Sequence, residues 1–168
     1  MSPLIIRAAT IKDISSIVKI RLETLSDDEI SGFSAPEFAN TSSPEALLDS
    51  WERGNMLKDG CEVFLAEDDR RIVGYMMFKV EGDSGYIDDI VVYKEEQGKG
   101  VGKKLVTYAE YIAKSLGCHF MKTDTTENIS GVPWRSYNFW LKMDYEDTGE
   151  RIPTKYDFKE IHFIKKLI

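Results

Sequence analysis

Three glycines at alternate positions, at the start of a predicted helix, form the stretch of this chain that is best suited to chemistry. Gly98, Gly100 and Gly102 follow an apolar, strand-like run at 86–93. Apolar residues then recur every three or four positions as far as Leu116, which is typical of one helix face. A helix N-terminus presents unpaired N–H groups, and glycines let a ligand approach the backbone closely. The pattern therefore predicts a site for a phosphate or pyrophosphate.

The spacing of these glycines differs from that of two common nucleotide-binding loops. A Walker A loop would need glycine at Gln97 and serine or threonine at Lys104. A dinucleotide fingerprint would need glycine at Lys103. The chain instead matches Q-x-x-G-x-G, at Gln97, Gly100 and Gly102. A glycine-rich turn with solvated lysines is the structural alternative to a phosphate site.

This loop resembles the coenzyme A pyrophosphate loop of the GNAT N-acetyltransferases, written R/Q-x-x-G-x-G/A. The run GYIDDIVV-x5-QGKGVGKKL is similar to the family's fourth strand, loop and third helix, and particularly to those of glucosamine-phosphate N-acetyltransferases. The resemblance implies acetyl-CoA as cosubstrate, held by backbone groups of the strand and the loop and by an asparagine after the fifth strand. The residues implied are Ile90, Val91, Val92, Gln97, Gly98, Lys99, Gly100, Val101, Gly102, Lys103 and Asn128.

Two consecutive carboxylates, Asp88 and Asp89, interrupt the apolar strand. Successive strand side chains point to opposite faces, so at most one of them is expected in the core. In the GNAT family an acidic side chain on this strand often receives the proton of the amine. We therefore predict that Asp88 or Asp89 is the general base or binds the incoming ammonium. A salt bridge to a neighbouring strand or helix is the alternative.

The last predicted helix departs from the family pattern. Many members carry F-Y-x-x-x-G-F there, and the tyrosine protonates the departing thiolate. Trp140 stands at that tyrosine position here, and an indole cannot act as an acid near neutral pH. Tyr137 lies one turn earlier on roughly the same helix face, so we predict it as the acid. The thiolate could also leave into solvent without an acid, and core packing is the alternative for the aromatic residues.

The predicted elements that must position these residues alternate between strands and helices. The order is α+β with a mixed sheet, and the resemblance implies the GNAT (acyl-CoA N-acyltransferase) fold. That fold has a mostly antiparallel sheet of about seven strands, a splay between strands four and five, and about four flanking helices. We predict strands at 4–7, 62–67, 72–81, 86–93, 118–124, 145–149 and 158–167, helices at 14–26, 44–56, 101–116 and 134–142, and loops at 27–43 and 125–133.

The composition limits the classes of partner. The chain has 168 residues and a formal net charge of −7, which argues against general affinity for nucleic acid or an anionic membrane. The acidic balance favours a cationic acceptor, either a small-molecule amine or the amine of a protein or peptide. We expect a single N-acetyltransferase domain over 1–168, without a membrane span or signal peptide. Exposed edge strands near the C-terminus favour a homodimer.

The cysteines and histidines fit a protein without a metal site. The two cysteines, Cys61 and Cys118, and the two histidines make no ligand set with metal spacing. We expect both thiols to be free and buried, in a reducing, cytoplasmic setting, and no metal cofactor.

The sequence thus predicts an N-acetyltransferase in which the amine attacks acetyl-CoA directly in a ternary complex. The alternatives are a transferase of the same fold that uses another acyl-CoA, and a non-catalytic module that binds or senses acyl-CoA. We expect residues 25–51 and 148–157 to determine the acceptor. The acidic residues Glu23, Asp27, Asp28 and Glu29 either attract a cationic amine or form a solvated surface.

Overall fold

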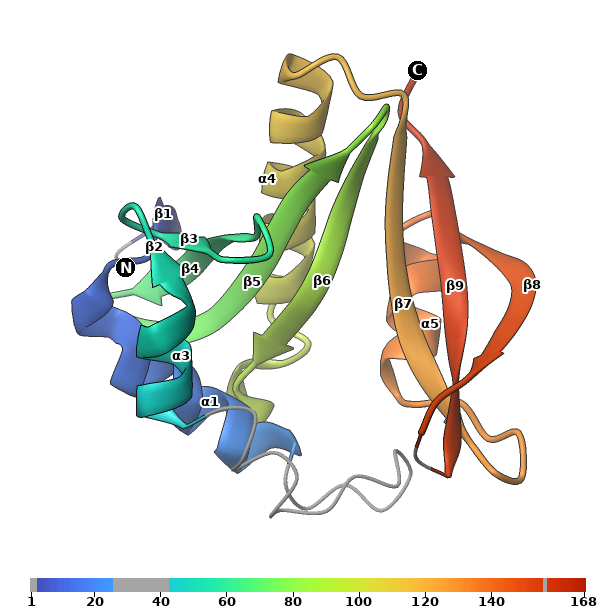
Figure 1. Cartoon of the computed structure of the whole chain (residues 1–168), viewed down its shortest axis with the longest axis horizontal. Coiled ribbons are helices and arrows are strands. Elements are labelled where there is room, and N and C mark those ends of the chain that lie inside the picture. The colour runs from blue at the N-terminus through green and yellow to red at the C-terminus, as the bar shows by residue number, and fades with distance from the viewer. Residues whose placement is uncertain (1–2, 26–42, 156) are drawn as a thin grey trace.

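A computed structural model describes residues 3–25, 43–155 and 157–168 and shows one large sheet with helices on both faces (Figure 1). The strands are β1 (Ile5–Ala8), β2 (Trp51–Glu52), β3 (Met56–Leu57), β4 (Glu62–Asp68), β5 (Arg71–Glu81), β6 (Ser84–Val92), β7 (Phe120–Asn128), β8 (Glu146–Pro153) and β9 (Phe158–Lys166). The helices are α1 (Ile14–Leu25), α3 (Pro44–Ser50), α4 (Val101–Ser115) and α5 (Ser136–Lys142), with short 3₁₀ turns η1 (Ile11–Asp13) and η2 (Lys94–Glu96). The sheet order is β2-β3-β4-β5-β6-β7-β9-β8, and β1 pairs with β4.

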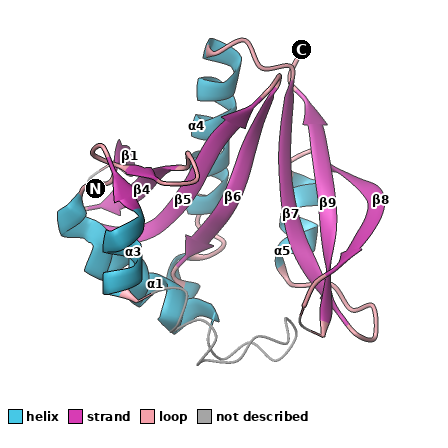
Figure 2. Cartoon of the chain, in the orientation of Figure 1, coloured by secondary structure: helices cyan, strands magenta, loops and turns pink. Residues whose placement is uncertain are grey.

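The sheet opens between its two central strands. β6 and β7 are parallel and pair only from Ser84 opposite Phe120 to Ile87 opposite Thr123. Beyond these pairs the two strands diverge into the V that Figure 2 shows. The Thr123 hydroxyl donates a hydrogen bond of 3.0 Å to the Ile87 carbonyl at the last pair. The predicted mixed sheet, mostly antiparallel and splayed between strands 86–93 and 118–124, is therefore confirmed.

A β-bulge lies in β6 at the level where the splay begins. Met77 of β5 pairs with Asp89, whereas Phe78 pairs with Ile87, so Asp88 is the extra residue. A bulge breaks the alternation of side chains between the two faces of a strand. The rule that neighbouring strand residues face opposite ways therefore does not apply to Asp88 and Asp89.

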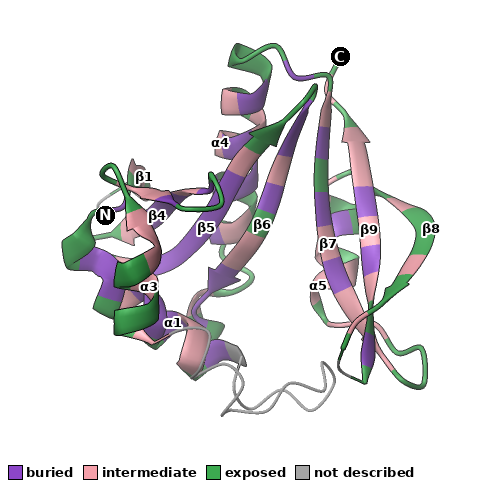
Figure 3. Ribbon diagram, in the orientation of Figure 1, coloured by how far each residue is buried: buried purple, intermediate pink, exposed green. Residues whose placement is uncertain are grey.

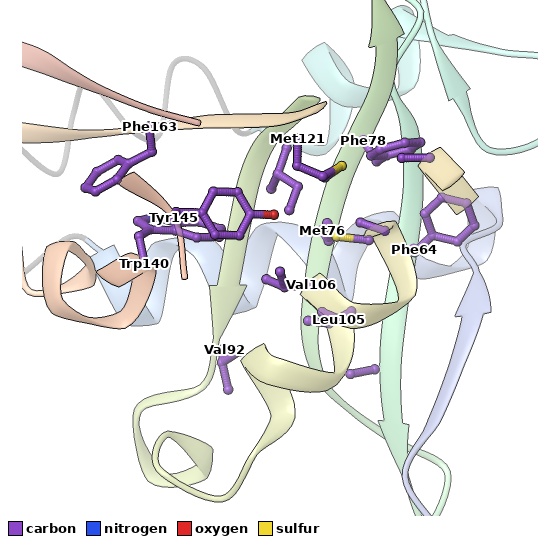
Figure 4. Packing of buried hydrophobic residues seen from close by; sticks show 14 of the residues in the cluster. Phe64, Met76, Phe78, Val92, Leu105, Val106, Met121, Trp140, Tyr145 and Phe163 are labelled. Atoms are coloured by element: carbon purple, nitrogen blue, oxygen red, sulfur yellow. The ribbon is translucent and has the colours of Figure 1, made fainter. Parts of the chain in front are cut away.

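Each face of the sheet packs against its own helices. β4 shows the division, because Phe64 and Ala66 join the core under α4 and α5 while Val63 and Leu65 join the core under α1. The first of these cores is shown in Figure 4, where Trp140 of α5 lies beside Tyr145, with ring centroids 5.0 Å apart. Figure 3 shows the buried residues concentrated in β4, β5 and the strands bordering the splay.

One glycine permits α4 to lie close to the sheet. A Cβ added to Gly85 would come within 2.6 Å of the Met121 sulfur and 2.9 Å of the Ala113 Cβ. Both thiols, Cys61 and Cys118, are free and buried, as predicted. No helix among the described residues is long and apolar enough to cross a membrane.

The structure differs from the sequence prediction in the number of strands and in several element boundaries. The sheet has nine strands rather than about seven. The helix predicted at 44–56 ends at Ser50, because Arg53 and Gly54 adopt positive φ values and turn the chain into the β2–β3 hairpin. The fifth predicted strand continues to Asn128, beyond residue 124. All of the predicted loop at 27–43 except its last residue lies outside the described residues, as do Asp27, Asp28 and Glu29.

Candidate active site

The glycine loop leads into the N-terminus of α4, where the first backbone N–H groups of the helix are unpaired among the described residues. Gly98 and Gly100 have φ values of +78° and +88°, a region that glycine adopts readily. The first intrahelical bond is from the Lys104 N–H to the Gly100 carbonyl, at 3.0 Å. Within the described residues, no hydrogen bond is made by the three preceding N–H groups of the helix, and no side chain caps it. These N–H groups and the positive end of the helix dipole favour the binding of an anion here.

Gln97 takes a different place from the one that the loop motif implied. Its own N–H already donates to the Lys94 carbonyl at 3.3 Å. Its side-chain amide donates to the Val92 carbonyl at 3.0 Å, so Gln97 ties the loop to the end of β6. The N–H groups that are available to an anion therefore begin after Gln97.

The lysines around the loop divide between protein partners and solvent-facing positions. Lys99 pairs with Glu96 at 3.3 Å, and Lys104 donates to the Leu4 carbonyl. Lys103 lines the cavity that begins at the loop.

That cavity has a volume of about 630 Å³ and extends from the loop along β6 to α5. The pairing of β6 with β7 ends at Ile87, so the following residues of β6 present an open backbone edge. Eight of the predicted cofactor residues line it: Ile90, Val91, Val92, Gln97, Gly98, Gly100, Gly102 and Lys103. We call it the donor cavity. Lys99 and Val101 do not line it, and Val101 is buried in the core.

A second cavity of about 640 Å³ lies on the other side of the splay, between α1, β6 and β7. We call it the acceptor cavity. Its carboxylates are Asp88, Asp89, Asp124 and Glu160. Four residues line both cavities, namely Ile90, Val91, Trp134 and Ser136. The two cavities therefore meet beside the open edge of β6.

The bulge brings both strand carboxylates to the acceptor cavity, in different electrostatic states. Asp89 forms a salt bridge with Arg21 of α1 and accepts a 2.8 Å hydrogen bond from the Tyr75 hydroxyl. Asp88 has no hydrogen-bond partner among the described residues, and the Asp59 carboxylate and the Cys61 thiol lie near it. The Asp88 side chain is exposed at the cavity, but the surrounding protein atoms remove part of its hydration, and this desolvation together with the Asp89 charge raises the pKa of Asp88 above its ordinary value. A carboxylate with a raised pKa and no partner is a suitable proton acceptor.

Asp124 lines the acceptor cavity from β7 and was not predicted. It accepts a hydrogen bond from the Tyr86 hydroxyl at the point where β6 and β7 separate. Burial raises the pKa of Asp124 to about 6, and the charges of Glu160 and Asp88 act in the same direction. Carboxyl groups therefore line the acceptor cavity from both β6 and β7, and the cationic side chains of Arg21 and Lys155 also border it.

Comparison with known proteins decides the family. The profile of the Acetyltransferase (GNAT) family matches residues 22–132, which include β6, the glycine loop and α4. The chain belongs to the GNAT acetyltransferase family. It is 31% identical over 106 residues to an uncharacterized N-acetyltransferase of Methanocaldococcus jannaschii. That match covers 61% of this chain and 65% of the relative, so it spans slightly less than two thirds of the relative's length.

Solved GNAT structures share the whole fold at low sequence identity. The PaiA N-acetyltransferase of Thermoplasma acidophilum, solved in complex with coenzyme A, has a TM-score of 0.78 and 18% identity, covering 98% of this chain and 99% of its own. A GCN5-related N-acetyltransferase from Rhodopseudomonas palustris has a TM-score of 0.75 and 17% identity, covering 99% and 97%. These similarities confirm the predicted GNAT fold. GNAT enzymes take their acetyl group from acetyl-CoA, which agrees with the predicted cosubstrate.

Two residues predicted from the GNAT pattern lie away from both cavities. The Tyr137 hydroxyl donates to Asp147 at 2.8 Å, and its ring packs on Phe163. Asp147 in turn pairs with Arg151 of β8 at 2.8 Å, so these charges hold the hydroxyl on the β8 side. The Asn128 side chain accepts the N–H groups of Ser130 and Val132 and so stabilises its own turn. Their predicted roles in this GNAT chain receive no support from their positions.

Sequence reasoning missed Arg21, Tyr75, Asp124 and Ser136, although each lines the acceptor cavity. Arg21 falls within the apolar stripe of the predicted helix, one turn from Ile17, and a charged residue there was an available signal. Tyr75 lies in an apolar run and is typical of a core position there. One signal for Asp124 was available, since a carboxylate within a strand needs a partner or a function. Only the tertiary arrangement shows that these residues share one cavity.

The raised pKa of Asp124 makes a prediction about stability. An unfolded aspartic acid titrates near 3.9, so the stability contributed by this group is complete below about pH 4 and is lost as the pH rises through about 6. Between pH 5 and 7 we expect Asp124 ionisation to lower the free energy of unfolding by about 1 kcal/mol, or Tm by about 3 °C. Thermal unfolding of wild type and Asp124→Asn at both pH values measures this. An equal pH dependence in the two proteins would contradict it.

Proposed function

We propose that this GNAT chain transfers an acetyl group from acetyl-CoA to a primary amine by direct attack within a ternary complex. The observation that carries the proposal is that the two cavities share Ile90 and Val91 of β6, and Asp88 precedes these residues on the same strand. A donor bound along the loop and the open β6 edge reaches the junction of the two cavities from one side. An amine in the acceptor cavity reaches it from the other, so no covalent enzyme intermediate is needed.

The donor cavity suits each part of the coenzyme. The free N–H groups at the start of α4 would hold the pyrophosphate, with Lys103 adding positive charge at the cavity wall. The open edge of β6 would hydrogen-bond the extended pantetheine arm as an added strand. Backbone groups from Ile90 to Val92 would then lie along the arm and the thioester carbonyl.

Asp88 is the better of the two carboxylates for the role of general base. The amine must lose a proton to attack, and Asp88 has a raised pKa and no other partner among the described residues. Asp89 is held in its ion pair with Arg21. As the carbon–nitrogen bond forms and the carbon–sulfur bond breaks, the sulfur takes the electron pair and Asp88 takes the proton of the amine.

We propose that the acceptor is a cationic amine, either a small molecule or an exposed amine of a peptide. Asp88, Asp124 and Glu160 line the cavity that it would enter.

The homodimer that the sequence favoured receives little support from the edge strand near the C-terminus. β8 is an end of the sheet and carries charged residues and Pro153, which discourage pairing of edge strands.

Tyr137 provides a test of how the thiolate leaves. The hydrogen bond to Asp147 raises the pKa of Tyr137, which makes it a weaker acid. We expect Tyr137→Phe to keep kcat within about twofold, with the same alkaline limb in its pH profile, because the hydroxyl lies outside both cavities. A tenfold loss of kcat with an altered alkaline limb would restore Tyr137 as the acid.

Release of free thiol from acetyl-CoA over a panel of monoamines, polyamines and peptides tests the proposed function. We expect turnover with at least one cationic amine, and mass spectrometry should find one acetyl group on its nitrogen. Binding of acetyl-CoA without turnover on any amine would favour a sensing module. Faster turnover with longer acyl-CoA donors would favour another acyltransferase of this fold.

A further inference from the structure

Ser136 is the side chain with a hydroxyl at the junction of the two cavities. Of the four residues that line both, Ile90 and Val91 are apolar and Trp134 carries an indole. Ser136 is the first residue of α5 and lies across the junction from β6. Its hydroxyl oxygen is 2.7 Å from that of Thr125 in β7.

The hydroxyls of Thr125 and Ser136 have one O–H donor left after they bond to each other. Two hydroxyls carry two protons, and the bond between Thr125 and Ser136 uses one of them. Neither hydroxyl has a further hydrogen-bond partner among the described residues. Thr125 is only 6% exposed, whereas Ser136 is partly exposed and borders both cavities. When Thr125 donates, the remaining O–H belongs to Ser136 and can point into the junction.

We propose that Ser136 is a catalytic residue whose hydroxyl, positioned by Thr125, donates a hydrogen bond to the sulfur of the departing coenzyme A thiolate. This inference rests on the proposed function, because the reacting thioester must lie where the donor and acceptor cavities meet. With its carbonyl oxygen held by the backbone of β6, the thioester would present its sulfur to the wall that α5 provides.

The proposed step needs no additional acid. As the amine nitrogen bonds to the carbonyl carbon, the carbon–sulfur bond breaks and the electron pair moves to sulfur. Ser136 keeps its proton and stabilises the developing charge through the hydrogen bond. A thiol titrates near 8.5, so its anion forms far more easily than an alkoxide and requires stabilisation rather than full protonation. Trp140, at the position of the family tyrosine, is only 1% exposed and packs against Phe139 and Tyr145.

The experiment compares Ser136→Ala with the wild type in two measurements. In steady-state turnover we expect kcat to fall about tenfold while the KM for acetyl-CoA stays within twofold, because the bond forms mainly in the transition state. In the binary complex with coenzyme A, ultraviolet absorbance of the thiolate gives the pKa of the bound thiol. We expect that pKa to be about one unit higher in Ser136→Ala than in wild type, since the stabilising donor is lost.

Two further variants make the result specific. Thr125→Val should shift kcat and the bound-thiol pKa in the same direction by a smaller amount, because it removes the group that positions Ser136. Ser115→Ala, at the far end of α4, is the matched control and should leave both values unchanged. An unchanged kcat or an unchanged thiol pKa in Ser136→Ala would overturn the proposal, as would a thiol shift found in Trp134→Phe instead.

The thiol titration also separates this inference from the proposed function. It needs only bound coenzyme A, so it can be read even if no amine is acetylated. If the wild type acetylates an amine but Ser136→Ala has the same bound-thiol pKa as the wild type, the proposed role of Ser136 is refuted and the proposed function stands.

Discussion

Replacing Asp88 by asparagine is expected to lower kcat for amine acetylation at neutral pH about a hundredfold, with little change in the KM for acetyl-CoA. Asparagine keeps the size of the side chain but cannot take a proton from the amine. In wild type, the rate should fall as the pH drops through the raised pKa of Asp88, because the protonated carboxyl no longer accepts a proton. Asp88→Asn should lose this acid limb. Steady-state rates from pH 5 to 9 measure both effects.

Asp59 offers a matched control for Asp88. Its carboxylate lies near that of Asp88 but borders neither cavity. Asp59→Asn retains the oxygen that accepts the Cys61 N–H, so folding should be preserved. Its charge contributes to the raised pKa of Asp88, and we therefore expect normal kcat with the acid limb moved slightly to lower pH. Equal rates for Asp88→Asn and wild type across this range would exclude Asp88 as the base.

Gly100→Ala is expected to weaken coenzyme A binding about thirtyfold, which corresponds to about 2 kcal/mol. The φ of +88° strains any L-residue, and the added methyl group would enter open space where the ligand approaches the α4 N-terminus. The strain should also lower Tm by about 3–6 °C. Calorimetric titration with coenzyme A measures the affinity.

Gly149 controls for the backbone strain. Its φ is +84°, a Cβ there would also meet nothing within 4 Å, and it lines neither cavity. Gly149→Ala should therefore lower Tm by a similar amount and leave coenzyme A affinity unchanged. If both variants, or neither, lost affinity, the loop would not be the pyrophosphate site.

The fold was predictable from local patterns where these patterns are strong. The periodic apolar face of α4, the glycines before it and the β-branched end of β6 each indicate one structure, and all of these elements form as predicted. The β2–β3 hairpin was missed because Trp51 and Met56 also fit the apolar spacing of a helix. Such short strands carry too few residues for a period of two to be recognised.

The site was less predictable, because it depends on contacts between distant elements. The bulge at Asp88 follows from the pairing of β6 with β5, and two adjacent aspartates give no sign of it. The spacing of Tyr137 and Trp140 placed them on one face of α5, but the charged pair of Asp147 and Arg151 holds the Tyr137 hydroxyl elsewhere. Ser136 became a candidate only once the two cavities were seen to meet.

The splay has a consequence for solubility. A strand edge on the outer surface of a protein offers unpaired amides and carbonyls to any passing chain and promotes aggregation. The unpaired edge of β6 beyond Ile87 lies inside the sheet, with β7 and α5 lining the cavities opposite it. A slender extended molecule can enter there, whereas a second folded copy is too bulky to do so. The unpaired edge of β6 is therefore accessible to an extended small molecule and protected from pairing with a strand of another protein.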